Sequence, residues 1–322
     1  MTFSKARRFI LTAATVLAAI SFAGLDAARA DYPEKGLTLI VPYGAGGGTD
    51  ITARLLAKDL EDLIGKPVTV QNIAGGGGWR GWGALASAKP DGYTIGYLNV
   101  PAIYAGYLDA KLGRKESMDS FTPIINHVID YNVLTVKADS PYKNLKDLVE
   151  AAKKAPETIS ISAHGVGGDE HLAIIAFERA SGAKFKIVQN KSTPESKTQV
   201  LGGHVQILAS NVSEIATEVK EGQLRVLGVM SSQKSQFLPG APTFKDQGVN
   251  VEASNSRGIA APAGLPKDIE TKLVGWLEKV INSKEHQAKA IKLSLEPQVI
   301  RADEYKKFLK DNEQDVKKLM GW

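Results

Sequence analysis

Three glycine-rich loops are the segments of this sequence best suited to bind a ligand. They span residues 44–48, 75–78 and 165–168, and each follows an apolar run and precedes a segment with helical periodicity. Glycine lets the backbone approach a ligand closely, and the first turn of a helix offers unpaired N–H groups and the positive end of the helix dipole. One such loop is equally well explained as a tight turn, but three in corresponding places favour a site for an anion such as a carboxylate.

The second loop also matches a dinucleotide-binding pattern. Gly76, Gly78 and Gly81 have the Gly-x-Gly-x-x-Gly spacing of that pattern. A single match inside a run of glycines is a weak signal, and the sequence has no Gly-Lys-Ser or Gly-Lys-Thr of a phosphate-binding loop. We therefore expect no nucleotide and no other cofactor.

The sequence lacks the residue patterns of common catalytic sites. It has no Gly-x-Ser-x-Gly motif, no His-x-x-x-His pair and no cysteine. Asp169 and Glu170, beside His164 and His171, could form an acid–base pair, but Asp169 is better explained as a helix cap, because acids stabilise the first turn of a helix. We predict that the chain is not an enzyme and holds no metal.

The first thirty residues have the features of a secretion signal. Basic residues precede an apolar run that ends near Gly24, and Ala28-Arg29-Ala30 matches a cleavage signature. The apolar run is short for a helix that spans a bilayer. We expect export to the periplasm with cleavage after Ala30.

Composition excludes some partners and agrees with export. The formal net charge of +5 falls to about +2 without the first thirty residues, and the remaining charges are interspersed. Binding to nucleic acid would require a clustered basic face, so we expect none. The absence of cysteine is compatible with an exported chain whose core is large enough to need no disulfide.

Apolar runs alternate with helical patterns along the rest of the chain. One series of strand–loop–helix units starts at residue 37, and a second starts near residue 132. This alternation predicts two α/β lobes, each a mostly parallel sheet flanked by helices. Lobe 1 would comprise residues 31–128 and 230–322, and lobe 2 residues 129–229. A ligand would bind in the cleft between them, at the carboxyl ends of the strands.

A series of short motifs runs through the mature chain in a fixed order. They are Tyr32-Pro33, Ile40–Asp50, Gly65–Val68, Gly76–Gly78, Ala88–Thr94, Phe121–Ile124, Gly165–Gly167, His171-Leu172, Leu201–Gly203 and Ala261–Gly264. In this order they resemble the substrate-binding proteins of tripartite tricarboxylate transporters, often called Bug proteins. The resemblance covers essentially the whole mature chain.

The resemblance implies a periplasmic binding protein of type II-like fold that closes on its ligand by a hinge motion. It also implies delivery of the ligand to an integral membrane permease of two subunits, and a ligand carboxylate held between segments 43–50 and 162–169. The residues predicted to bind ligand are Tyr43, Ala45, Gly46, Gly47, Thr49, Asp50, Ser162, His164, Gly165, Gly167, Gly168, Asp169, Asn211 and Arg257.

Departures from the family pattern bear on the choice of ligand. Many members have Ser or Thr where this chain has Gly168, Asp169 and Glu170. Because an acid beside the pocket would repel a carboxylate, a ligand with a cationic group is also left open. Arg257 could bind a second carboxylate through two parallel N–H groups. We expect a monomer that binds a C4 dicarboxylate such as malate or succinate. The alternatives are a longer aliphatic or an aromatic carboxylate, or a periplasmic sensing role.

Overall fold

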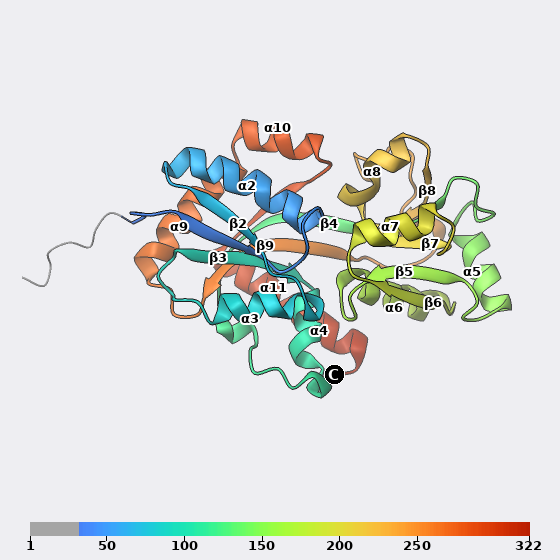
Figure 1. Ribbon diagram of the computed structural model, residues 1–322. Helices are drawn as coiled ribbons and strands as arrows, with labels where there is room; N and C mark the ends of the chain where they lie inside the picture. Colours follow the sequence, from blue (N-terminus) through green and yellow to red (C-terminus); the bar gives the residue numbers. More distant parts are fainter. Residues whose placement is uncertain (1–31) are drawn as a thin grey trace, which may run out of the picture. The chain divides into compact units, whose positions relative to one another are not determined.

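The computed structural model describes residues 32–322 of the chain (Figure 1). The predicted secretion signal, residues 1–30, lies outside the described residues. Lys35–Trp322 form one unit with its own internal contacts. Within residues 32–322, no helix combines the length and the apolar character that crossing a membrane requires.

The first sheet is built from strands near both ends of this unit. Hydrogen bonds connect them in the order β2-β1-β3-β9-β4, and β10 also pairs with β4. β1 is parallel to β2 and β3, whereas β9 is antiparallel to β3 and β4. The strands are β1 Leu37–Val41, β2 Val68–Asn72, β3 Thr94–Val100, β4 Phe121–Lys137, β9 Ser254–Pro262 and β10 Pro297–Arg301.

The second sheet is built from the middle of the chain. Its order is β6-β5-β7-β4, and β8 pairs with β4 as well. β5 is parallel to β6 and β7, whereas β7 and β8 are antiparallel to β4. The new strands are β5 Ser160–His164, β6 Lys186–Asn190, β7 Ile207–Asn211 and β8 Leu224–Val229.

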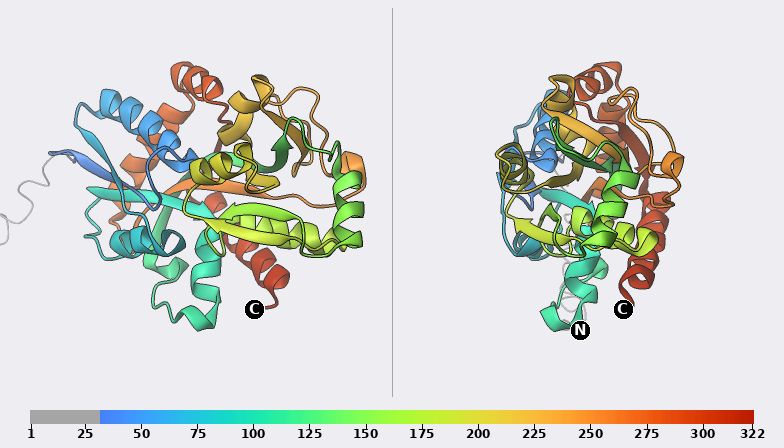
Figure 2. Two further views of the ribbon diagram at one scale, coloured as in Figure 1. Left: turned by 45° about the vertical axis from the view of Figure 1, so that its right-hand side comes forward. Right: turned by 90° about the vertical axis from the view of Figure 1, so that its right-hand side faces the viewer.

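The long strand β4 belongs to both sheets. Its first part, Phe121 to Tyr131, pairs with β9, and its last part, from Asn132, pairs with β7 and β8. Figures 1 and 2 show β4 and β9 side by side as they run from one group of strands toward the other. The two sheets are therefore joined by continuous hydrogen-bonded strands rather than by loops alone.

Helices cover both sheets, as the alternating pattern predicts. On the first sheet, α2 and α10 lie on one side and α3, α4 and α11 on the other (Figure 1). The helices of the first sheet are α2 Gly48–Ile64, α3 Trp79–Ala86, α4 Ala102–Leu108, α9 Lys267–Ile281, α10 Lys284–Lys292 and α11 Ala302–Met320. Those of the second sheet are α5 Leu145–Lys154, α6 Asp169–Ser181, α7 Thr193–Leu201 and α8 Val212–Lys220.

Each sheet has its own apolar core. Trp82 and Tyr104 are buried in the core of the first sheet, and Phe177 in a core of the second. Phe244 and Val251 pack in the same core as Phe177, so the segment after β8 lies against the second sheet before the chain enters β9. The α/β class predicted from the sequence is confirmed, and the antiparallel strands are those that pair with β4 or β9.

A buried polar chain ties α2 and α10 to the first sheet. Tyr97 Oη lies 2.8 Å from His127 Nδ1, and His127 Nε2 lies 2.8 Å from His286 Nε2. His286 Nδ1 in turn lies 2.7 Å from Asp59 Oδ2. Burial, reinforced by the neighbouring His286, lowers the pKa of His127 well below its usual range. These two histidines are therefore structural, and they lie apart from the glycine loops.

Candidate functional site

All three glycine loops occupy the position that the sequence predicts, directly after a strand and before a helix. The first joins β1 to α2, and the third joins β5 to α6. The second loop leads into α3 and contacts the third: a Cβ on Gly77 would lie 3.6 Å from Val166 O, and one on Gly165 would lie 3.8 Å from Gly77 Cα. Among the described residues, the second and third loops are therefore in close contact, and no ligand cavity separates them.

The first loop is stabilised by its own acid, Asp50. Gly46 N–H donates to Asp50 Oδ2 at 2.9 Å, and Asn72 Nδ2 donates to Asp50 Oδ1 at 2.9 Å. Burial would raise the pKa of Asp50, but the hydrogen bonds from Arg54, Gly46 and Asn72 outweigh it and lower the pKa. Asp50 thus braces the loop, while Ala45 and Gly46 are exposed to solvent.

A small cavity lies where the first loop meets elements of the second sheet. Six of the predicted ligand-binding residues line it: Tyr43, Gly47, Thr49, His164, Asn211 and Arg257. Residues that the sequence analysis did not select complete the lining: Gly44, Gly48, Lys191, Ser192, Thr193, Glu214 and Asn255. Its volume is about 20 Å³, which is about the room that one water molecule needs. In this arrangement the cavity has no room for a dicarboxylate.

Arg257, on β9, lines this cavity and is 1% exposed. Its Nη1 lies 2.9 Å from Asp130 Oδ2, and its Nη2 donates to Asn211 Oδ1 at 3.0 Å. Burial would lower its pKa, but Asp130, Glu214 and Asp169 raise it, so the guanidinium keeps its charge. The charge of Arg257 is thus already paired within the protein, and its role toward a second ligand carboxylate stays a prediction.

Gly48 is the point where Arg257 meets the first loop. It is the first residue of α2, and a Cβ there would lie 2.5 Å from Arg257 Nη2. The helix has no side-chain cap, because its N-cap is Gly47. A guanidinium and the positive end of a helix therefore converge on one wall of the cavity, the arrangement that favours an anion.

Asp169 is a hub for three amide side chains. Its Oδ2 accepts from Asn132 Nδ2 at 3.1 Å and from Asn211 Nδ2 at 2.9 Å, and its Oδ1 accepts from Asn255 Nδ2 at 3.0 Å. The predicted cap role is wrong, because Gly168 is the N-cap of α6 and Asp169 is the first helical residue. Asp169 lines a neighbouring cavity between α6 and α11, not the one at the first loop.

The amide network continues to the first loop. Asn99 Nδ2 donates to Asn255 Oδ1 at 3.2 Å and to Thr49 Oγ1 at 2.8 Å. Side chains from α2, β3, β9 and α6 are therefore connected through the centre of the molecule. The network fixes Thr49 at one end and Asp169 at the other.

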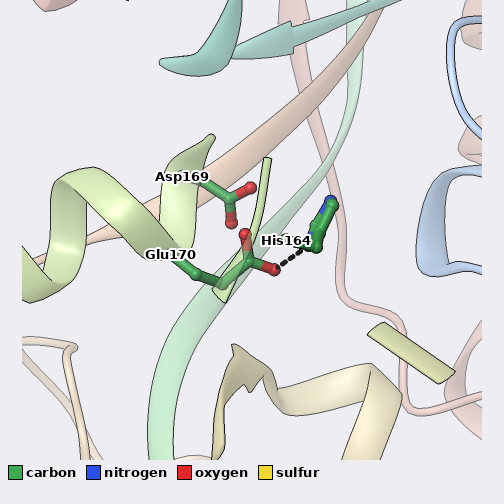
Figure 3. Close-up of side chains that lie close together, drawn as sticks. All are labelled: His164, Asp169 and Glu170. Atoms are coloured by element: carbon green, nitrogen blue, oxygen red, sulfur yellow. Dashed lines mark ion pairs between the residues drawn. The ribbon is translucent and has the colours of Figure 1, made fainter. Parts of the chain in front are cut away.

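At the third loop, half-buried His164 pairs with fully buried Glu170. Their Nδ1 and Oε1 atoms lie 2.8 Å apart, and Figure 3 shows the Asp169 carboxylate beside that of Glu170. Burial would lower the pKa of His164, but the charge and hydrogen bond of Glu170 outweigh it and raise the pKa to about 10. Burial, together with the charge of Asp169, raises the pKa of Glu170 to about 8. Both groups therefore bind their protons more tightly than the free side chains do.

The spacing of these groups would also suit a metal ion. One donor atom each from His164, Asp169 and Glu170 lies within 4.8 Å of the others. However, Asp169 accepts three amide hydrogen bonds, and Nδ1 of His164 is directed at Glu170. A proton-bearing pair beside an amide hub accounts for the geometry better than a ligand set does.

The His164–Glu170 pair predicts that stability falls as the pH rises. Both pKa values are higher than the usual 4.5 for Glu and 6.5 for His, so the folded protein holds both protons more tightly than the unfolded chain. Stability from Glu170 is then lost between pH 4.5 and about 8, and stability from His164 between pH 6.5 and about 10. Denaturant unfolding across this range should show the fall, and a His164→Gln/Glu170→Gln variant should show a smaller one. A stability that rises with pH would contradict the pairing.

The other predicted residues in and before the third loop are closely surrounded by protein atoms. A Cβ on Gly167 would lie 2.7 Å from Ala105 Cβ, and one on Gly168 would lie 2.6 Å from His164 O. Ser162 is fully buried in β5, and its Oγ has no hydrogen-bond partner among residues 32–322. None of these three residues, nor Gly165, lines the cavity at the first loop.

Of the residues that the sequence analysis missed, Glu214 had a visible signal. It stands three positions after Asn211, and together they form a capping box at the start of α8. Gly48 belongs to the first glycine run but was not selected. Asn255 could be noticed only as a neighbour of Arg257, and Asp130 gave no signal, because its partners are distant in the sequence.

Comparison with known proteins agrees with this architecture. Residues 52–321 match the family model described as tripartite tricarboxylate transporter family receptor. A relative from Cupriavidus necator, the UPF0065 protein in gbd 5'region, is 30% identical over 311 residues, which are 94% of this chain and 93% of the relative.

Solved structures of binding proteins share the fold. The periplasmic binding protein BugD is 28% identical with a TM-score of 0.83, over 90% of this chain and 98% of that one. Rpa4515 of R. palustris, solved with adipate, has a TM-score of 0.83 at 24% identity over 90% and 97% of the two chains. MatC from Rhodopseudomonas palustris, with bound malate, has a TM-score of 0.80 at 19% identity over 89% and 99%.

The similarity confirms the two-lobed periplasmic binding fold that the resemblance implies. The similar solved structures include a TctC solute binding protein from Polaromonas and the periplasmic binding protein BugD. Because the family model covers most of the sequence, the chain belongs to the tripartite tricarboxylate transporter family receptors, which include the Bug proteins.

Proposed function

We propose that this protein captures a small carboxylate in the periplasm and delivers it to a membrane permease of two subunits. It acts as a monomeric receptor and not as an enzyme. One observation carries the proposal: at the cavity, the uncapped N-terminus of α2 already binds a carboxylate. Gly48 N–H donates to Glu214 Oε1 at 3.1 Å, and Arg257 stands over the same glycine. A ligand carboxylate in this place would meet the same donors.

The proposed ligand is a C4 dicarboxylate such as malate or succinate. The malate of MatC and the adipate of Rpa4515 are both dicarboxylates, so proteins with this fold accommodate that class. Arg257 is the cation in the lining best placed to meet a second carboxylate, and Lys191 lines the same cavity at its exposed side. The alternative ligand is a longer aliphatic or an aromatic carboxylate. It would require a longer cleft between the lobes than a C4 dicarboxylate does.

Ligand entry would require the two sheets to separate, because the cavity holds only about 20 Å³. The sequence predicts lobes of residues 31–128 with 230–322 and residues 129–229, with flexing near Ile125–Tyr131 and Val229–Gln233. We propose these lobes with one boundary moved, so that residues 230–253 belong to the second lobe, and with flexing in β4 near Ile125–Tyr131. Phe244 and Val251 pack against the second sheet, which favours a return crossing close to Ser254, where β9 begins. Closing such a hinge around the ligand would complete its contacts from both sides.

Calorimetric titration with succinate, malate, glutarate and adipate tests the ligand. We expect the C4 acids to bind at least tenfold more tightly than adipate, because a chain two carbons longer would have to bend or push Arg257 from Asp130. Tighter binding of adipate would overturn the proposed length. Binding of none of the four acids would overturn the proposed ligand class.

A further inference from the structure

Among residues 32–322, Glu214 is the only one that brings a carboxylate to the cavity lining, and it reaches across from α8 to α2. Its Oε1 accepts from Gly48 N–H at 3.1 Å, and its Oε2 accepts from Asn211 N–H at 3.1 Å. Gly48 begins α2 beside the first sheet, whereas Asn211 ends β7 of the second sheet and Glu214 lies in the following helix, α8. One half-buried side chain therefore connects the two sheets through the centre of the proposed ligand site.

The position that Glu214 occupies is suited to a ligand anion. The N-cap of α2 is Gly47, which provides no side chain of its own to meet the helix N-terminus. A Cβ on Gly48 would lie 2.9 Å from Arg257 Cζ, so the guanidinium is directly adjacent. Arg257 Nε is buried and has no hydrogen-bond acceptor within the described residues, 32–322. Arg257, which lines the cavity, thus keeps an unused donor, and its guanidinium lies beside the helix N-terminus that Glu214 meets.

We propose that Glu214 is a built-in competitor of the ligand. In the unliganded protein its carboxylate holds the anion position at the N-terminus of α2, and the ligand carboxylate must displace it. The cavity of about 20 Å³ cannot hold both carboxylates. The inference rests on the proposed function, since it concerns the same site.

Displacement would leave the helix start of α8 intact. Glu214 is the third residue of α8, and its Oε2 completes the capping box with Asn211. Only Oε1 has to leave Gly48. The exchange replaces one charge-assisted hydrogen bond to Gly48 N–H by another. The affinity for the ligand therefore reflects how much more strongly the ligand carboxylate binds this position than Glu214 does. Losing the contact also releases a link between the sheets.

Glu214→Gln tests the competition. Glutamine keeps the size of the side chain and the capping box but lacks the charge that strengthens the bond to Gly48. We expect the variant to bind succinate or malate about tenfold more tightly than the wild type, the ratio of a charged to a neutral hydrogen bond. The matched control is Glu218→Gln, one turn further on α8, whose carboxylate pairs with Lys197 outside the cavity lining. The control should bind as the wild type does.

A second measurement needs no ligand. The sequence has no cysteine, so Lys89→Cys and Lys154→Cys, at exposed positions beside the first and second sheets, can carry a pair of spin labels. In the unliganded protein, Glu214→Gln should lengthen or broaden the distance distribution between the labels, because the link from α8 to α2 is weakened.

The outcomes separate this inference from the proposed function. Unchanged or weaker carboxylate binding by Glu214→Gln would overturn the competition, and weaker binding would show that Glu214 contacts the ligand directly. An unchanged distance distribution would overturn the link between the sheets. If the wild type binds no carboxylate, the proposed function fails, while the spin-label distances still decide whether Glu214 holds the sheets together.

Discussion

Replacing Arg257 with alanine is expected to lower the free energy of unfolding by about 3–5 kcal/mol, the usual cost of removing one partner of a buried ion pair. Asp130 is 5% exposed and would keep a carboxylate without its cation. Asn211 Oδ1 would also lose the N–H of Arg257 that it accepts. Denaturant unfolding of the variant and the wild type measures the loss directly.

Two further variants test whether the stability comes from the ion pair between Arg257 and Asp130. Arg257→Lys keeps the charge but cannot reach Asp130 and Asn211 together, so it should recover only part of the stability. Adding Asp130→Asn to Arg257→Ala should cost less than the sum of the single changes, because the two side chains interact directly. If Arg257→Ala unfolds at the same denaturant concentration as the wild type, the buried pair is not a structural element.

Replacing Gly48 with valine is expected to abolish carboxylate binding while the protein stays folded. A Cβ at this position would lie 2.5 Å from Arg257 Nη2 and 3.1 Å from Glu214 Oε1, so it would enter the place of the anion. The backbone of Gly48 is helical, which valine tolerates, and the displaced groups are the ends of two side chains. Part of the stability is lost because Arg257 must shift from Asp130. Calorimetric titration should show at least a hundredfold weaker binding, and circular dichroism should show a native spectrum.

Gly47→Ala is the matched control for this steric argument. Its φ of −81° is open to any residue, and the nearest atom to the new Cβ is Gly44 O at 3.8 Å. We expect alanine there to leave binding within a few-fold of the wild type. Equal losses in both variants would mean that the loop needs glycine for another reason, and binding by Gly48→Val would move the anion position elsewhere.

The local elements of the fold could be predicted because their signals are local. Glycine runs after apolar strands mark the turns into α2 and α6, and alternating strand and helix patterns give the α/β class. Strand β4 was less visible. The sequence indicated a strand only from Asn132, whereas the structure extends it back to Phe121.

The early part of β4 was hidden by polar residues whose partners are distant. Asn126 bonds Gln298 O and Ser256, His127 bonds Tyr97 and His286, and Asp130 bonds Ser213 and Arg257. In the sequence these side chains break the apolar pattern of a buried strand. In the fold each is satisfied by contacts between residues 30 to 172 positions apart.

The centre of the candidate site was hidden for the same reason. Gly48 and Glu214 are 166 positions apart, and Asn211 and Arg257 are 46 apart. Sequence patterns located the first loop and His164, because glycine runs lead to them, and Arg257, because it departs from the family pattern. They could not show that the carboxylate at the helix N-terminus comes from the chain itself.

A thermal-shift screen of the wild-type protein against mono-, di- and tricarboxylates tests the central claim most directly, because a ligand that binds only the folded state raises the melting temperature. At a hundred times its dissociation constant, a bound ligand adds about 2.7 kcal/mol to stability. We predict that at least one small carboxylate, succinate or malate first, raises the melting temperature, and that its uncharged diamide does not. If no carboxylate in the panel raises the melting temperature at saturating concentration, or if the diamides raise it equally, the cavity is not a carboxylate site.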